Sequence, residues 1–143
     1  MPPDTARLSG LLAHPLRLKP GEDLRDALRD RAEQAGWQAV FIVAGIGSLR
    51  PVALRLAGAE TPTLIDDDAE LLTLSGTFGS GGVHLHASVA LADGRVLGGH
   101  VGPGCRVRTT AELLLAVLPA HRFDREDDAE TGCRELVVRP RSG

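Results

Sequence analysis

The segment from Val83 to His100 reads VHLHASVALADGRVLGGH, and this pattern predicts a β-hairpin. Apolar residues alternate with His84 and His86, so both imidazoles are expected on the same face of one strand. The Asp93-Gly94 pair is a strong signal for a tight turn, which brings the residues up to His100 back beside that strand. Three of the chain's five histidines fall in this segment. The hairpin therefore gathers three imidazoles in one part of a sheet.

The composition is that of an ordinary globular domain. The 143 residues are 43% hydrophobic and 24% charged, which predicts a single domain over residues 1–143, with its core at about 8–138 and short flexible termini. One Trp, three Phe and no Tyr argue against an aromatic platform for single-stranded nucleic acid. The net charge of −3, with arginines scattered among acids, argues against direct DNA binding.

The cysteines and the N-terminus bear on the cellular compartment. Cys105 and Cys133 are far apart and form no CxxC motif, which predicts reduced thiols. The first residues lack a signal-peptide pattern, and no apolar run approaches the roughly 20 residues of a membrane span. A cytoplasmic location without a membrane partner is therefore expected.

The remaining periodicities predict an α+β fold. Apolar residues at helical spacing from Leu24 to Ala35, ended by Gly36, predict one helix. A second helix is predicted from Thr109 to Pro119, because Thr109-Thr110-Ala111-Glu112 has a capping-box pattern. Residues 121–131 are charged and predicted to form a loop. Strands are predicted at 8–18, 37–44, 52–57, 63–65, 70–78, 83–91, 95–100 and 133–138. Together these elements make a largely antiparallel β-sheet with two principal helices.

The run Gly45-Ile46-Gly47-Ser48-Leu49-Arg50 begins like a dinucleotide-binding fingerprint but does not complete it. Arg50 stands where the third glycine is needed, and a strand rather than a helix is expected to follow. We interpret these glycines as a bend between two strands.

The three histidines are the candidate metal ligands. Neutral imidazole suits Zn²⁺ or another divalent transition metal, and His84, His86 and His100 would leave one coordination position open. In the alternative interpretation, His84 and His86 only form hydrogen bonds on a polar sheet face, and His100 is unrelated to them. The spacing alone leaves both interpretations open.

A second candidate site lies at the start of the second predicted helix. Exposed N–H groups at Thr109 and Thr110, with Arg106 and Arg108 nearby, are suited to holding an anion. Alternatively, this is only a capped helix whose arginines pair with local acids or a neighbouring subunit. Cys105 beside this helix start is either a thiol of lowered pKa or a buried structural cysteine.

Several motifs in order along the chain resemble the PPC (plants and prokaryotes conserved) domain family. They span about Leu16 to Val138 and include the runs 45–50, 70–78, 84–88, 94–100, 108–112, 123–126 and 131–136. The resemblance implies an α+β fold assembled as a homotrimer, free-standing in prokaryotes, with a metal held by His84, His86 and His100. In plants the domain follows AT-hook motifs, whose Arg-Gly-Arg-Pro core is absent here, so the DNA contact of those proteins is not carried over.

Three function classes follow from these observations. The leading hypothesis is a small, homotrimeric, zinc-binding module that acts in ligand binding or protein assembly, with itself, a small anionic ligand or another protein as partner. The first alternative is a metal-dependent enzyme, for which Glu112 is the nearest acid–base candidate by sequence. The second alternative is a DNA-binding or transcription-associated protein.

Overall fold

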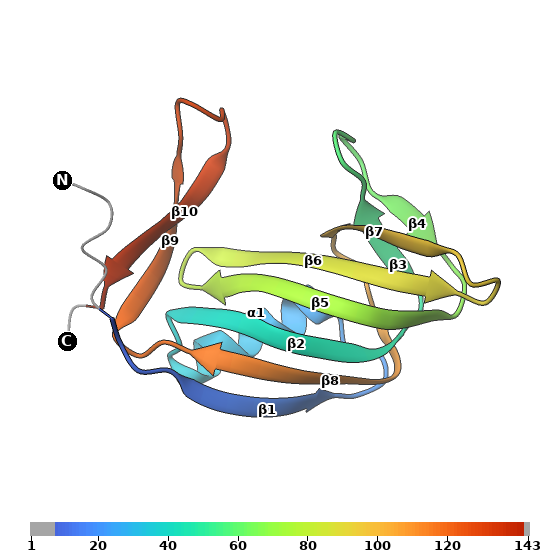
Figure 1. The fold of residues 1–143 in the computed structure, drawn as a ribbon, viewed down its shortest axis with the longest axis horizontal. Coiled ribbons are helices and arrows are strands. Elements are labelled where there is room, and N and C mark those ends of the chain that lie inside the picture. The colour runs from blue at the N-terminus through green and yellow to red at the C-terminus, as the bar shows by residue number, and fades with distance from the viewer. Residues whose placement is uncertain (1–7, 142–143) are drawn as a thin grey trace.

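The computed structural model describes residues 8–141, which form ten strands and one helix (Figure 1). The helix is α1 (Leu24–Ala35). The strands are β1 (Leu12–Leu18), β2 (Ala39–Leu49), β3 (Val52–Arg55), β4 (Thr63–Ile65), β5 (Ala69–Gly79), β6 (Gly82–Leu91), β7 (Val96–Val101), β8 (Val107–Val117), β9 (His121–Asp127) and β10 (Arg134–Pro140). This part of the chain contains no helix long and apolar enough to cross a membrane.

Eight strands form one antiparallel sheet in the order β1-β8-β2-β5-β6-β7-β3-β4, and β9 and β10 form a separate hairpin. Helix α1 packs across one face of the large sheet, behind β2 and β5 in Figure 1. The β9–β10 hairpin projects from the sheet near the turn that joins β5 and β6, and β3 and β4 rise at the other end. One face of the sheet is thus covered by the helix, and the opposite face carries the hairpin at one end.

The core lies between α1 and the sheet. Strand residues that face the helix, such as Leu85 on β6 and Leu115 on β8, are fully buried. The helix contributes Leu24 and Leu28 to the same cluster. Period-2 alternation therefore places the other residues of the strands, including His84, on the face opposite the helix.

The first helix is confirmed, together with its end at Gly36. The Asp23 side chain caps its N-terminus by accepting a hydrogen bond from the N–H of Asp26, and the same carboxylate accepts a second bond from the N–H of Gly104. Gly36 has a φ of 70°, the left-handed conformation common after the last helical turn. A single buried acid therefore ties the start of α1 to the segment that leads into β8.

The second predicted helix is wrong: residues 107–117 form strand β8, which lies between β1 and β2. Leu113 and Leu115 are buried while Glu112 and Leu114 between them are exposed, so the burial has a period of two. An apolar run of this length is compatible with a helix or with a buried strand. Here it forms a strand, because its backbone pairs with β1 on one side and with β2 on the other. The predicted fold class is otherwise confirmed, with one helix in the described residues instead of two.

Two smaller corrections concern strand ends. Gly45 to Ser48 do not form a bend between strands but continue β2 to Leu49. The predicted loop at 121–131 contains strand β9, whose charged residues are compatible with a hairpin that lies outside the main core. The residues predicted as flexible termini lie partly at 1–7 and 142–143, outside the described residues.

Candidate metal centre

The three histidines meet on the sheet face opposite α1. His86 on β6 and His100 on β7 are direct partners in the antiparallel register, and His84 lies two residues along β6 on the same face. This is the arrangement that the hairpin pattern predicts. The three imidazoles therefore come from a single hairpin of the sheet.

The distances between the rings suit a shared ion. The Nε2 atoms of His84 and His86 are 3.2 Å apart, and one potential ligand atom from each of the three residues lies within 4.8 Å of the other two. Two nitrogens bound to one tetrahedral Zn²⁺ at about 2.0–2.1 Å lie about 3.3 Å from each other. The pair formed by His84 and His86 is therefore already at the spacing of two zinc ligands, and the set of three imidazoles fits Zn²⁺.

The surroundings keep two of these imidazoles neutral. Burial, together with the charges of His84 and Arg55, lowers the pKa of His100 to about 4. Burial also lowers the pKa of His84, with a further contribution from the guanidinium of Arg125. A neutral imidazole has a free lone pair, so both residues are in the form that binds a metal at neutral pH.

Arg125 on β9 contacts this cluster, although the sequence analysis assigned it no role in the site. Its Nη2 donates a hydrogen bond to Oγ1 of Thr77 at 3.0 Å and lies 3.3 Å from Nδ1 of His84. A guanidinium has no acceptor, so this contact requires the His84 tautomer that carries its proton on Nε2. A metal bound at Nε2 would require the proton on Nδ1, so metal binding there would break the contact with Arg125. The prediction of a loop at 121–131 had separated Arg125 from the histidines.

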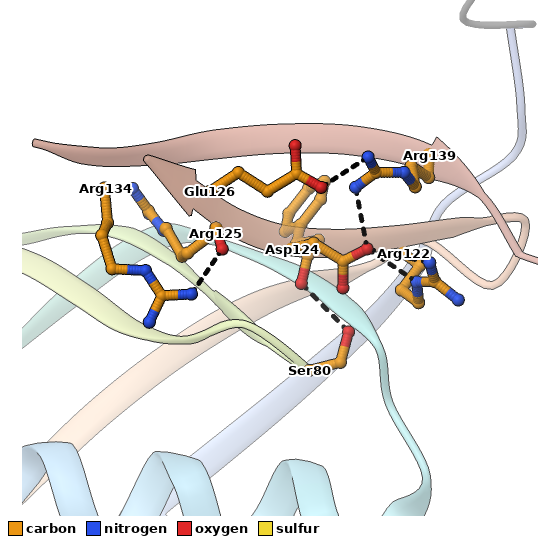
Figure 2. A network of polar contacts seen from close by, with 8 residues as sticks. Ser80, Arg122, Asp124, Arg125, Glu126, Arg134 and Arg139 are labelled. Carbon is orange, nitrogen blue, oxygen red and sulfur yellow. Dashed lines mark hydrogen bonds and ion pairs between the residues drawn. The ribbon is translucent and has the colours of Figure 1, made fainter. Parts of the chain in front are cut away.

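A polar network fixes the hairpin that carries Arg125 (Figure 2). Arg139 on β10 donates to Asp124 at 3.1 Å and to Glu126 at 2.6 Å, which links the two strands of the hairpin. Oγ of Ser80, in the turn between β5 and β6, donates to the carbonyl oxygen of Phe123 at 3.0 Å. The hairpin is therefore attached to the same β5–β6 unit that carries His84.

The second candidate site was predicted at a helix N-terminus, but the structure has strand β8 at this position. Arg106 donates to the carbonyl oxygen of Gly21, and Arg108 pairs with Asp68 at 3.1 Å. On β8, Thr109 is hydrogen-bonded to Ser48, and Thr110 accepts from Arg17. Arg108 thus follows the alternative interpretation, in which it pairs with a local acid, and none of these four residues lines the histidine pocket.

Cys105 is a buried structural cysteine, the second of the two interpretations given above. Its side chain is fully buried, and its Sγ donates to the carbonyl oxygen of Ala53 and accepts from the N–H of the same residue. Burial raises the pKa of the Cys105 thiol, the opposite of what a reactive cysteine requires.

A pocket of about 370 Å³ opens over the three imidazoles. It is lined by Arg55, Leu56, Ala57, His84, His86, Gly98, Gly99 and His100, with no carboxylate among these described residues. Glu112, the acid–base candidate by sequence, lies instead on β8 and lines a separate open groove of about 620 Å³. Glu112, the nearest acid–base candidate by sequence, therefore does not line the histidine pocket.

The model of one domain family, the Plants and Prokaryotes Conserved domain, matches residues 7–119. The chain belongs to this family. The resemblance noted from the motifs is thereby confirmed, including the match to the segment with the three histidines.

Solved structures share the fold of this family member. A hypothetical protein from Salmonella enterica is 40% identical with a TM-score of 0.91, over 95% of this chain and 99% of its own. A plant- and prokaryote-conserved protein from Pyrococcus horikoshii is 25% identical with a TM-score of 0.72, over 90% of this chain and 94% of its own. A metal-containing protein from Archaeoglobus fulgidus is 24% identical with a TM-score of 0.78, over 91% of this chain and 98% of its own, and shows the shared fold.

A curated relative is much longer than this chain. The bifunctional protein GlmU of a Synechococcus strain is 43% identical over 143 residues, which are 100% of this chain and 22% of that protein. The chain thus spans about a fifth of that relative's length.

Proposed function

We propose that this chain is a metal-binding module in which His84, His86 and His100 hold a zinc ion. The observation that carries the proposal is the convergence of three imidazoles from two paired strands at near-coordination distances. The ion would supply a Lewis-acidic position with one site open to a further ligand. A protein of the same fold, from Archaeoglobus fulgidus, is described as metal-containing, which supports the proposal.

The test is the metal content of untagged protein, measured by plasma mass spectrometry after Zn²⁺ is offered and excess is removed. About one zinc per chain is expected for the wild type, and none for the His84→Ala, His86→Ala double variant. His121→Ala is the matched control, because His121 lies on β9 outside the cluster, where its Nδ1 contacts Ser9. A metal-free wild type, or a double variant that keeps its zinc, would disprove the proposal.

We also propose that the module assembles as a homotrimer through the sheet face opposite α1. This face exposes large apolar side chains, including Phe41, Val43 and Ile46 on β2 and Leu114 on β8. Ile46 and Leu114 line the groove of about 620 Å³ on the same side. A contiguous exposed apolar surface of this kind is typical of an interface, and the family resemblance points to three copies.

Native mass spectrometry measures the assembly directly. Three chains of 15.1 kDa each would give about 45 kDa. Ile46→Asp places a charge in the groove and is expected to yield monomers. Leu64→Asp is the matched control, because Leu64 is 77% exposed on the short strand β4 at the sheet edge. A monomeric wild type would exclude the trimer, and a trimeric Ile46→Asp variant would place the interface elsewhere.

The surroundings of the histidines favour a binding role over the two alternatives. An enzyme that uses metal-bound hydroxide would profit from a general base, and the lining residues of the pocket offer no carboxylate. On α1, Arg29 pairs with Asp26 and Arg31 lies 3.9 Å from Glu22, so these arginines do not present a free basic stripe to DNA. The module is therefore proposed to bind a ligand at the metal or to organise a protein assembly.

A further inference from the structure

Three arginines from three different elements surround the histidine pocket. Arg55 at the end of β3 lines the pocket and is the register partner of His100. Arg125 on β9 contacts His84. Arg25 on α1 donates to the carbonyl oxygens of Val83 and Val101, each the chain neighbour of a histidine. The fold thus brings three positive charges to one small site.

These arginines are not neutralised by ion pairs within residues 8–141. Arg25, Arg55 and Arg125 bond only to carbonyl, hydroxyl or imidazole groups. Arginines elsewhere on the surface pair with carboxylates, as Arg50 does with Asp66 and Asp68. Glu135 on β10 supplies the opposing charge that acts on His84. Because no carboxylate lies among the residues that line the pocket, these arginines make the pocket electropositive, and a divalent ion would increase the positive potential.

The pocket has the size and lining for a small ligand with one charged end. Its volume of about 370 Å³ is at the low end of the usual range for small-molecule sites, about 300–1,000 Å³. Arg55 and the imidazoles form its polar side, while Leu56 and Ala57 form an apolar side. Only one hydrogen bond is formed by the Arg55 guanidinium within the described residues, a 3.3 Å contact to the carbonyl oxygen of Ala59. The remaining N–H groups of Arg55 are available to a ligand.

We propose that this pocket binds a small oxyanion ligand, a carboxylate or phosphate group, between the metal and the guanidinium of Arg55. This inference rests on the proposed metal site and names the class of ligand for its open position. One oxygen of the anion would take the open metal position, and another would accept hydrogen bonds from Arg55, a geometry that planar guanidinium groups favour for both anion types. Arg25 and Arg125, held by their own hydrogen bonds, would add attraction without direct contact.

The experiment is calorimetric titration of the zinc-loaded protein with inorganic phosphate in one arm and acetate in the other. The arm that binds more tightly identifies the anion type. Arg55→Gln is expected to weaken binding of that anion by about 10- to 100-fold, the loss typical of a charge-assisted hydrogen bond. Arg95→Gln removes the same charge at the β6–β7 turn, where Arg95 pairs with Asp93, and should change the affinity less than threefold. Zinc content is measured in every sample before titration.

Each outcome separates the two proposals. Zinc-loaded wild type that binds neither anion would overturn the anion site while the metal site stands. The same conclusion follows if Arg55→Gln retains its zinc and binds the anion as tightly as wild type, or if Arg95→Gln loses as much affinity as Arg55→Gln. A wild type without zinc would overturn the metal site, and the anion site with it, before any anion is added. Replacement of Zn²⁺ by Co²⁺ adds an independent readout, because anion binding at the open position alters the visible spectrum of the ion.

Discussion

Gly76→Ala tests whether the backbone of β5 must approach β6 closely beside His84. Gly76 lies opposite Leu85 and has a φ of 144°, a conformation that residues with a Cβ rarely adopt. An added Cβ would lie 2.9 Å from Cα of Leu85 and 3.0 Å from the carbonyl carbon of His84, and closer still to the carbonyl oxygen of His84. Backbone strain costs about 1–3 kcal/mol and steric overpacking about 1–3 kcal/mol more, so a total loss of about 2–6 kcal/mol is expected.

Gly82→Ala is the control variant, because it introduces the backbone strain of a positive φ without a steric clash. Gly82 has a φ of 108°, but an added Cβ there meets no atom within 4 Å. The expected loss is therefore about 1–3 kcal/mol, and the difference between the two variants isolates the clash. Equilibrium urea unfolding measures both losses, and chelator competition measures the zinc affinity, which should fall in Gly76→Ala because His84 must move. Equal stabilities of the two variants, with unchanged zinc affinity, would refute the reasoning.

Three further predictions follow from the site and the core. Because the pKa of His100 is lowered to about 4 and that of His84 is lowered as well, protons compete for these ligands only at acidic pH. Zinc affinity at pH 5.5 should stay within about 100-fold of its value at pH 7.5, against about 1,000-fold for three unperturbed imidazoles, as chelator competition at each pH will show. A colorimetric thiol reagent should modify exposed Cys133 rapidly and buried Cys105 only after unfolding; fast reaction of both in the native protein would contradict the burial. Asp23→Ala removes the acceptor of two backbone N–H groups and should cost about 2–4 kcal/mol in urea unfolding, with a smaller loss for Asp23→Asn.

The sequence predicted those parts of the fold that are set by short-range patterns. Helix α1 and the β6–β7 hairpin were predicted because the cap, the turn pair and the apolar spacing all lie within each element. Residues 107–117 were misassigned because Leu113 to Val117 form a continuous apolar run, which is compatible with a buried strand as well as a helix. The partners that make this run a strand, β1 and β2, are distant in sequence.

The candidate site was likewise predicted only in part from the sequence. The histidines were found because they lie within one hairpin, whose register places His86 beside His100. The arginines around them come from α1, β3 and β9, and only the folded sheet brings these elements together. Nothing in the local sequence marks Arg55. Arg125 lies in the family run 123–126, but no role was assigned to it, because a single arginine in a polar segment is most often a solvated surface residue.

The two edges of the eight-stranded sheet limit how copies of this chain can associate. The outermost strands are β1 and β4; β4 has only three residues, and β1 carries Pro15, which has no N–H to donate. An unprotected edge invites a strand from another molecule and so leads to open-ended fibres, a hazard that short edge strands and edge prolines reduce. The proposed trimer would instead associate through the apolar face of the sheet, where packing can close into a ring of finite size. The chain can thus expose a large apolar surface while resisting the strand-by-strand growth that leads to amyloid.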